Sequence, residues 1–406
     1  MNPEMDKSLR LLIVGASARA AAHSALRAGL RPVGCDLFAD EDLRAVADVL
    51  PLEQYPYGLA AAAERAPDCP WMYTGALENH PEIVTRISRR RALLGNAAGA
   101  LELVRDPFHV RDILHAADFP FCNVRSVDDT PLPDGRWLLK PFQSAGGARI
   151  QPWSELAKQE AMHETAFDEN YFFQERAAGT PMSAVLLAMP DATWLIGVSR
   201  QLIGGDSANA GPFAYCGSIG PVSLTDSPWS QLERMGQAIA DECGLRGLFG
   251  IDFMFDGKTP WLTEVNPRYT ASVEVLEFAL DISLLGWHCH ACAAFDNSIP
   301  DLLPNHQFHT DGIAELSAQP PGQTVAKQII YAGRECVVSS LAEFTAENAG
   351  ARVPFLADIP AVGSIIPAGR PVCTVFATES DFESASQLLQ QRVSRIESTL
   401  QTRDSR

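Results

Sequence analysis

Acidic and amide side chains gather late in the chain, in the segment GIDFMFDGKTPWLTEVNPR. Asp252 lies in one apolar run, and Glu264 and Asn266 lie in the next, after a turn-like stretch at 256–258. A strand period of two puts Glu264 and Asn266 on the same face, and a hairpin brings Asp252 alongside them. Two carboxylates and an amide oxygen suit Mg²⁺ (or Mn²⁺) that also holds nucleotide phosphates. The alternative is a polar hairpin face with a salt bridge, although apolar neighbours make unpaired charges costly there.

A lysine and a glycine loop form a second candidate for chemistry, in LLKPFQSAGGARI (138–150). Lys140 lies in an apolar strand, and the loop that follows contains Gly146 and Gly147. A buried ammonium needs an anionic partner, and a glycine loop can bring backbone N–H groups close to phosphate oxygens. The alternative is a hairpin whose lysine reaches solvent. Arg268, two residues after Asn266, carries a guanidinium, which is suited to contact a transferred phosphoryl group or a substrate carboxylate.

Composition excludes several classes of protein. The 406 residues leave room for two or three domains, and 46% hydrophobic with 20% charged residues indicates a globular chain. A net charge of -18 argues against a nucleic-acid partner. The apolar stretches are too short for a membrane span and no export signal is evident, so we expect a cytoplasmic protein with no membrane partner. Nine scattered cysteines fit reduced thiols.

Hydrophobic patterning predicts the elements that position these groups. The first hundred residues alternate strands and helices and predict a small parallel α/β domain; the expected elements are strand 9–15, helix 16–29, strand 31–36, helix 59–65 and strand 71–74. After residue 101, β-rich segments predict an antiparallel sheet, with a helix at 229–243 and strands at 250–255 and 261–265. A third, smaller unit follows residue 300 and ends in a polar helix at about 379–400.

Taken in order, KPFQSAGGARI, QERAAGTPMSA, GVSRQLIG, GIDFMFD and TEVNPR resemble the ATP-grasp superfamily of ATP-dependent ligases over about 9–295. The tail ADIPAVGSIIPAGRPVCTVFA is similar to the end of biotin-carboxylase-type members. The resemblance implies an α/β plus α+β fold, in which an N-terminal parallel α/β domain precedes two ATP-binding subdomains. The implied boundaries are 1–100, 101–300 with a small lid subdomain at about 125–185, and 301–406.

The resemblance also assigns roles to individual residues. Lys140 would contact phosphate, Ser144, Gly146 and Gly147 would belong to a loop over the triphosphate, and Gln174 and Glu175 would form the adenine hinge. Asp252, Glu264 and Asn266 would hold magnesium, and Arg268 with Arg200 would steady an acyl phosphate. Members of this family phosphorylate a carboxylate with ATP, and an amine then displaces the phosphate. The implied cofactors are ATP and Mg²⁺ (or Mn²⁺), and the partners are small carboxylates and amines, with a homodimer as a further expectation.

Two positions depart from the family pattern. Many members have an Asp-Lys pair before the ATP-binding subdomain, whereas this chain has Arg105-Asp106-Pro107, so Arg105 or Arg111 must take the lysine's place. The glutamate that often binds the ribose is also missing, because Pro181, Met182 and Ser183 occupy that neighbourhood.

The run NPRYTASVEVLE is similar to the branch that contains tyramine–glutamate ligase and related one-carbon-cofactor proteins. This similarity implies an amino acid substrate, met by Tyr269, Thr270 and Ser272, and a role in cofactor biosynthesis. Two alternatives stay open: a nucleotide-binding protein without ligase turnover, and an NAD(P)-dependent oxidoreductase built on the N-terminal βαβ unit, where Asp36 ends a strand.

A zinc site is a further hypothesis for the segment His288–Cys292, because these two residues lie on one helical face. An apolar core helix is the simpler interpretation, since no second ligand pair follows at a typical spacing.

Overall fold

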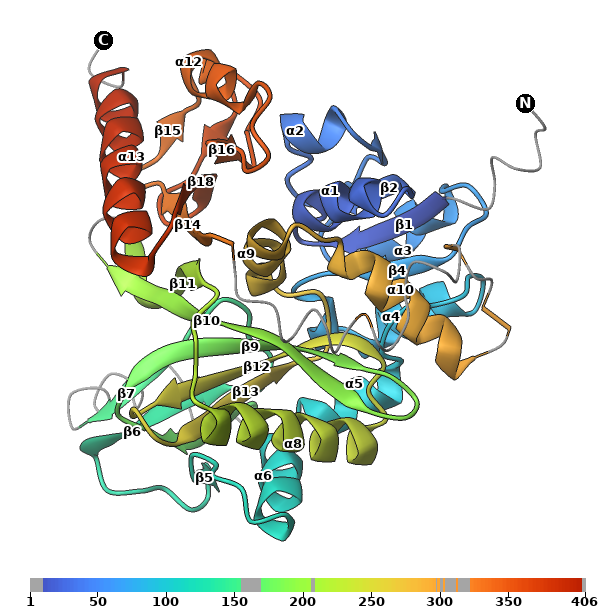
Figure 1. The fold of residues 1–406 in the computed structure, drawn as a ribbon, viewed down its shortest axis with the longest axis vertical. Helices are drawn as coiled ribbons and strands as arrows, with labels where there is room; N and C mark the ends of the chain where they lie inside the picture. Colours follow the sequence, from blue (N-terminus) through green and yellow to red (C-terminus); the bar gives the residue numbers. More distant parts are fainter. Residues whose placement is uncertain are drawn as a thin grey trace.

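The computed structural model describes residues 10–154, 169–205, 209–296, 298–299, 302–303, 312 and 322–403. Figure 1 shows an N-terminal part in blue, a central part in green and yellow, and a C-terminal part in orange and red.

The N-terminal part is built on a parallel sheet, as the sequence predicts. Its order is β3-β2-β1-β4, from β1 (Arg10–Gly15), β2 (Arg31–Asp36), β3 (Asp48–Val49) and β4 (Trp71–Tyr73). Almost every residue of β1 is buried, as expected for a parallel strand covered on both faces. The helices of this part are α1 (Arg19–Arg27), α2 (Glu41–Arg44), α3 (Leu59–Glu64) and α4 (Pro81–Ser88), with the short 3₁₀ helix η1 (Leu77–Asn79) after β4.

Two helices, α5 (Ala98–Val104) and α6 (Pro107–Ala116), lead into a small antiparallel sheet. Its strands are β5 (Val124–Ser126), β6 (Asp134–Pro141), β7 (Gln151–Ser154) and β8 (Tyr171–Glu175), in the order β5-β8-β6-β7. Part of the expected lid subdomain, residues 155–168, lies outside the described residues.

The largest sheet has eight strands in the order β13-β12-β9-β10-β11-β14-β18-β16. Five of them belong to the central part: β9 (Thr180–Ala188), β10 (Thr193–Gly205), β11 (Ala210–Gly220), β12 (Gly247–Phe255) and β13 (Pro260–Asn266). Helix α8 (Asp226–Cys243), which ends at Gly244 with φ +66°, packs on β9 and β10, below the sheet in Figure 1. Helices α9 (Ala271–Leu280) and α10 (Leu284–Phe295) lie above it, toward the N-terminal part.

The C-terminal segment continues this sheet. Strand β14 (Thr324–Tyr331) pairs with β11, β18 (Pro371–Glu379) pairs with β14, and β16 (Leu356–Ala357) pairs with β18. The final helix α13 (Phe382–Arg403) packs against β18 and β14. The remaining elements are β15 (Cys336–Val337), β17 (Ile365–Ile366), α12 (Ala342–Thr345) and η4 (Ala346–Asn348). The expected third unit at 301–406 therefore shares its sheet with the central part.

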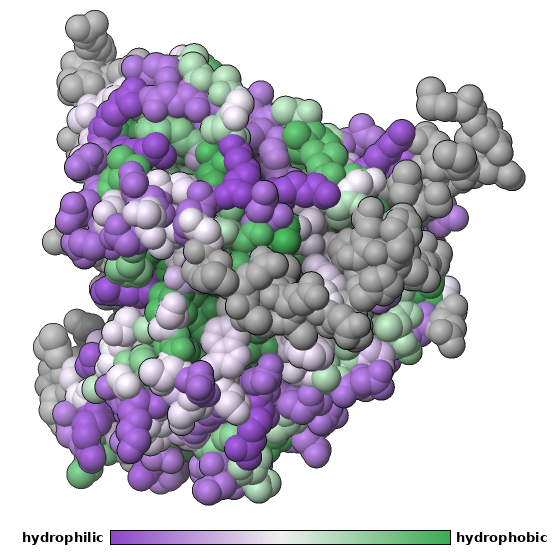
Figure 2. Space-filling view, viewed as in Figure 1, coloured by the Kyte–Doolittle hydropathy of each residue, from purple (hydrophilic) through white to green (hydrophobic). Residues whose placement is uncertain are grey.

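Figure 2 shows hydrophilic side chains over much of one face, with smaller hydrophobic patches between them. Among the described helices, none alone is long and apolar enough to cross a membrane; α9 and α10 pass that test only as a pair, bent by 113°.

Candidate active site

A cavity of about 400 Å³ lies between the small sheet β5–β8 and the edge of the large sheet formed by β9 to β13. Most of the residues that the sequence nominates line it, and they come from segments far apart in the chain. They are Lys140, Ser144, Gly146, Gly147, Gln174, Glu175, Asp252, Glu264, Asn266, Arg268, Thr270 and Ser272.

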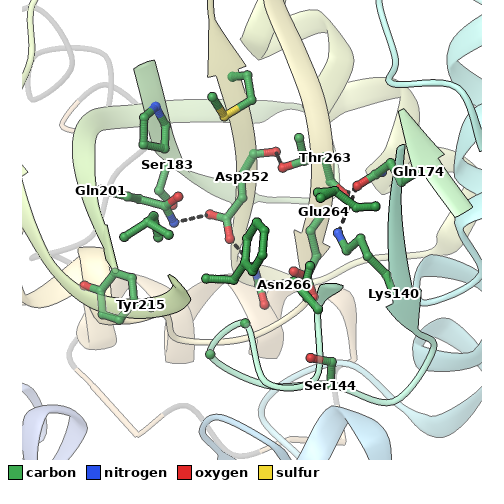
Figure 3. A pocket seen from close by; sticks show the side chains of 18 of the residues that line it. Lys140, Ser144, Gln174, Ser183, Gln201, Tyr215, Asp252, Thr263, Glu264 and Asn266 are labelled. Atoms are coloured by element: carbon green, nitrogen blue, oxygen red, sulfur yellow. Dashed lines mark hydrogen bonds between the residues drawn. The ribbon is translucent and has the colours of Figure 1, made fainter. Parts of the chain in front are cut away.

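The β12–β13 hairpin positions the acidic groups. Asp252 is directly opposite Glu264, and Gly250 is opposite Asn266, so all three polar side chains share one face (Figure 3). Asp252 Oδ1 accepts a hydrogen bond from Gln201 Nε2 at 3.0 Å, and Oδ2 accepts one from Asn266 Nδ2 at 3.0 Å. Burial, followed by the like charge of Glu264, raises the pKa of Asp252 to about 6. These two facing carboxylates favour a cation between them.

Arg105 forms an ion pair with Glu264 of the hairpin. Its Nη1 donates to Glu264 Oε1, and its Nη2 donates to the backbone oxygen of Phe142 at 3.1 Å. Burial alone would raise the pKa of Glu264, but Arg105 and Lys140 outweigh it and hold that pKa below its ordinary value. The structure thus places Arg105 in the cavity region, whereas Arg111 pairs with its neighbour Asp112 near the surface.

Lys140 reaches into the cavity from β6. Its ammonium donates to Gln174 Oε1 at 2.9 Å, and Gln174 Nε2 donates to the backbone oxygen of Thr263 at 3.0 Å (Figure 3). Only 8% of Lys140 is exposed, and burial lowers its pKa while Glu264 opposes that change. The lysine is therefore a buried cation that faces the acidic hairpin across the cavity.

The loop 144–147 closes one side of the cavity and depends on glycine. Gly147 has φ +79°, and a Cβ there would lie 1.8 Å from the backbone oxygen of Phe213. Tyr215 N donates to the Gly146 oxygen at 3.1 Å, which holds the loop against β11. A larger residue at 147 cannot fit without moving that strand.

Arg268 marks the other end of the cavity. Its Nε donates to Glu78 Oε1 at 2.7 Å and its Nη2 to Asn266 Oδ1 at 3.2 Å. Thr270 lines the same end, and its buried hydroxyl oxygen has no hydrogen-bond partner among the described residues. This end thus offers a fixed guanidinium and an unused hydroxyl to a small polar substrate.

Two nominated residues are not brought to the cavity. Arg200 lies next to Gln201 in β10, and because side chains alternate along a strand, Gln201 faces the cavity while the Arg200 guanidinium lies 5.6 Å from the Phe382 ring centroid. Tyr269 is buried in the core above the sheet, where its hydroxyl donates to Glu277 Oε2 at 2.9 Å. The structure therefore places neither Arg200 nor Tyr269 among the residues that line this cavity.

The zinc hypothesis does not fit the segment His288–Cys292. His288 Nδ1 accepts from Leu248 N at 2.9 Å and its Nε2 contacts the Leu94 oxygen at 3.1 Å, so neither ring nitrogen is left for a metal. Burial lowers the His288 pKa to about 4, which keeps the ring neutral in the core. Among the described residues, no group of three His, Cys, Asp or Glu side chains forms a metal site.

In the N-terminal βαβ unit, the aspartate at the end of β2 has hydrogen-bond partners of its own. The Asp36 carboxylate already accepts hydrogen bonds from the backbone N–H groups of Ala18, Phe38 and Ala39. It therefore stabilises its own loop.

The sequence did not nominate four residues that take part in this site: Ser183, Gln201, Tyr215 and Glu78. The alternation of side chains along a strand was a usable signal for Gln201, because it points to the opposite face from its neighbour Arg200. Glu78 follows a parallel strand at its carboxyl end, the edge where ligands bind in open α/β sheets. Tyr215 and Ser183 carried no local signal, because only the pairing of distant strands brings them to the cavity.

Comparison with known proteins agrees with this architecture. Residues 105–272 match the ATP-grasp domain family. A crystal structure of an L-amino acid ligase from Bacillus licheniformis superposes with a TM-score of 0.68 at 14% identity, covering 94% of this chain and 96% of that one. The ADP complex of N5-carboxyaminoimidazole ribonucleotide synthetase gives 0.67 at 16% identity, covering 97% and 98%. This chain therefore carries an ATP-grasp domain and has the ATP-grasp fold.

The chain is also similar to a curated protein over about half of its length. The formate-dependent phosphoribosylglycinamide formyltransferase of Pseudomonas syringae pv. tomato is 23% identical over 209 residues, which are 48% of this chain and 47% of that protein. This chain spans about half the length of the curated relatives it matches.

Proposed function

We propose that this protein is an ATP-dependent carboxylate–amine ligase. The observation that carries the proposal is the convergence of Lys140 with Asp252, Glu264 and Asn266 on one cavity, although these residues come from different sheets. The ATP-grasp domain match and the ligase neighbours support the same activity.

The nucleotide would lie between the two sheets. Lys140 and the backbone N–H groups of loop 144–147 would neutralise and orient the phosphates, because a buried ammonium and a glycine loop favour anions. The backbone of Gln174 and Glu175 would meet the adenine edge. Gln174 also fixes Lys140 through its side chain, so the same strand would position both ends of the nucleotide.

The hairpin residues fit Mg²⁺ or Mn²⁺. Asp252 and Glu264 supply hard carboxylate oxygens and Asn266 supplies an amide oxygen. A cation beside Asp252 would offset the burial and the like charge of Glu264 that raise its pKa. When bound, the ion would neutralise the phosphate oxygens. Phosphates and water would complete its shell.

Arg268 would orient the acid substrate. Glu78 and Asn266 hold its guanidinium, so a substrate carboxylate would meet a rigid pair of N–H donors. The carboxylate oxygen would attack the γ-phosphorus of ATP and release ADP. The amine nitrogen would then attack the acyl carbon, lose a proton to the surrounding water and expel inorganic phosphate. Thr270 and Ser272 would contact the substrates at this end.

Arg105 would replace the lysine that many family members have before the ATP-binding subdomain. It contacts Glu264 and the backbone at the start of the glycine loop, so it lies where a cation would bind the nucleotide phosphates. An arginine keeps its charge in a buried site more readily than a lysine does. The departure in sequence therefore preserves a cation at this place.

We further propose the boundaries 1–100, 101–300 and 301–406 for the functional parts, a homodimer, and a cytoplasmic setting without nucleic-acid or membrane partners. The setting is supported by nine cysteines that are all free thiols. A role in cofactor biosynthesis rests on the resemblance of the NPRYTASVEVLE run.

The test is release of ADP and phosphate from Mg·ATP with pools of acids, including formate and amino acids, and pools of amines. The proposal expects release that requires one acid and one amine, with the coupled product found by mass spectrometry. Nucleotide binding without release in any pool would favour the binding-only alternative. Enhanced NADH fluorescence on mixing would favour the oxidoreductase.

A further inference from the structure

The short helix η1 (Leu77–Asn79) carries two neighbouring side chains that contact opposite ends of the cavity. It follows β4 through Ala76, whose φ of +73° turns the chain sharply. Glu78 accepts from Arg268 at 2.7 Å, at the end assigned to the acid substrate. Asn79 contacts the glycine loop, at the end assigned to the phosphates.

The Asn79 amide matches its two partners in polarity. Its Nδ2 donates to the Ser144 backbone oxygen at 3.1 Å, and its Oδ1 accepts from Arg105 Nη2 at 3.2 Å. Arg105 also donates to the backbone oxygens of Phe142 and Ser144. The backbone at the start of the glycine loop is thus held by a side chain of the N-terminal part and by an arginine that pairs with Glu264.

The opposite side of the loop is held by the large sheet. Tyr215 N donates to the Gly146 oxygen, and Gly147 packs directly on the Phe213 backbone. Both sides of the loop are therefore held by residues of this chain.

We propose that Asn79 is a positioning residue that holds the loop 144–147 over the phosphate end of the cavity, and that η1 links this loop to Arg268. Glu78 and Asn79 are neighbours in one helical turn, so the ion pair of Glu78 with Arg268 at the acid end and the contact of Asn79 with the loop depend on the same short segment. Loss of the Glu78–Arg268 ion pair would therefore loosen the hold of Asn79 on the loop. The nucleotide arm of the test below rests on the proposed function, whereas the loop arm does not.

The first experiment is hydrogen–deuterium exchange of the nucleotide-free protein, followed in peptides that cover 142–150 and 213–217. Asn79→Ala should speed exchange in both peptides by roughly 3- to 10-fold, the factor that one hydrogen bond of ordinary strength gives. Asn79→Asp keeps the acceptor for Arg105 but places a carboxylate oxygen against the Ser144 oxygen, so it should speed exchange at least as much. Unchanged exchange in both variants would overturn the proposal.

A matched control is Asn348→Ala, because Asn348 also bridges backbone groups with its amide, in the C-terminal part. Its Nδ2 donates to the Leu356 oxygen at 2.7 Å and its Oδ1 accepts from Phe355 N at 2.8 Å. This variant should leave exchange at 142–150 unchanged. Equal acceleration there would show a general loss of stability and would overturn the specific role of Asn79.

The link to Arg268 is tested with Glu78→Gln, which keeps the size of the side chain and removes the charge that holds the guanidinium. Exchange at 142–150 should rise, by less than in Asn79→Ala. No change would overturn the link.

The nucleotide arm measures binding of Mg·AMP-PNP to the same proteins. Asn79→Ala should weaken this binding roughly 3- to 10-fold, and Asn348→Ala should leave it unchanged. Wild-type affinity in Asn79→Ala would overturn the positioning role. If the wild-type protein itself does not bind Mg·AMP-PNP, the proposed function fails, and the exchange experiment still decides the role of Asn79.

Discussion

Two clusters of buried charge join distant parts of this chain, and they differ in how completely their charges are paired. The cavity cluster, Lys140, Arg105, Asp252 and Glu264, lines an open space. The sealed cluster, Arg19, Glu274, Lys327 and Asp358, fills the junction of α1, α9, β14 and the segment that follows β16.

The pKa values of the carboxylates express the difference. In the sealed cluster, burial opposes ionisation of Glu274, but Arg19 and Lys327 outweigh it and lower that pKa to about 2. In the cavity cluster, burial and Glu264 prevail and raise the pKa of Asp252 to about 6. Glu274, which pairs with two cations, joins parts of the molecule, whereas Asp252, which has no salt bridge among the described residues, faces a space for a ligand.

The largest expected effect is in the cavity cluster. Glu264→Gln removes one of the two carboxylates that would neutralise the metal, so Mg·ATP-dependent turnover should fall by roughly 100-fold or more, with the fold retained. Steady-state phosphate release and circular dichroism measure the two quantities. Turnover within a factor of three of wild type would refute the metal assignment.

The same substitution in the sealed cluster should act on stability. Glu274→Gln leaves Arg19 and Lys327 without their shared carboxylate, and we expect the free energy of unfolding to fall by about 3 kcal/mol. Urea unfolding of both variants, followed by fluorescence, makes the comparison. A larger stability loss in Glu264→Gln than in Glu274→Gln would reverse the distinction drawn between the clusters.

Acid should erase the contribution of the sealed cluster. The folded pKa of Glu274 is about 2 and its ordinary value is 4.5, so the unfolded chain binds more protons between these values. The stability that Glu274 provides is therefore complete above about pH 4.5 and is lost as pH falls toward 2, by on the order of 3 kcal/mol. Unfolding of wild type and Glu274→Gln should converge as pH is lowered from 6 to 3, and a constant difference would contradict this account.

The smallest effect is expected at Arg200, outside both clusters. Arg200→Ala removes a cation that lies over Phe382 and should change turnover by less than about twofold, since such exposed contacts are weak. Arg268→Ala is the matched arginine substitution in the cavity. A loss in Arg200→Ala comparable to that in Arg268→Ala would return Arg200 to the site.

Local pattern was enough to predict the elements that carry the chemistry. The strands 31–36 and 250–255 coincide with β2 and most of β12. The opposition of Asp252 and Glu264, in contrast, depends on a register shift between Asp252 and Phe253, which the hairpin turn alone does not set. The parallel N-terminal sheet and the antiparallel sheets were likewise predicted, because βαβ alternation and hairpins have short-range signatures.

What the sequence could not supply was long-range pairing and strand parity. Arg200 and Gln201 differ by one position, and β10 contains register shifts that no local pattern fixes. Arg105 and Arg111 were equivalent in sequence, and only the approach of α5 to the hairpin separates them. The union of β14 with β11 joins residues more than a hundred positions apart.

Because β14 pairs with β11, the central part cannot be produced alone without exposing a strand of its sheet. A polypeptide ending near residue 300 would lack β14 and leave β11, including Ile219, as a bare strand border with unpaired amides and carbonyls. An exposed edge strand pairs with the same strand of other copies, so the shortened polypeptide should aggregate and precipitate. The last quarter of the protein, by covering β11, prevents this aggregation.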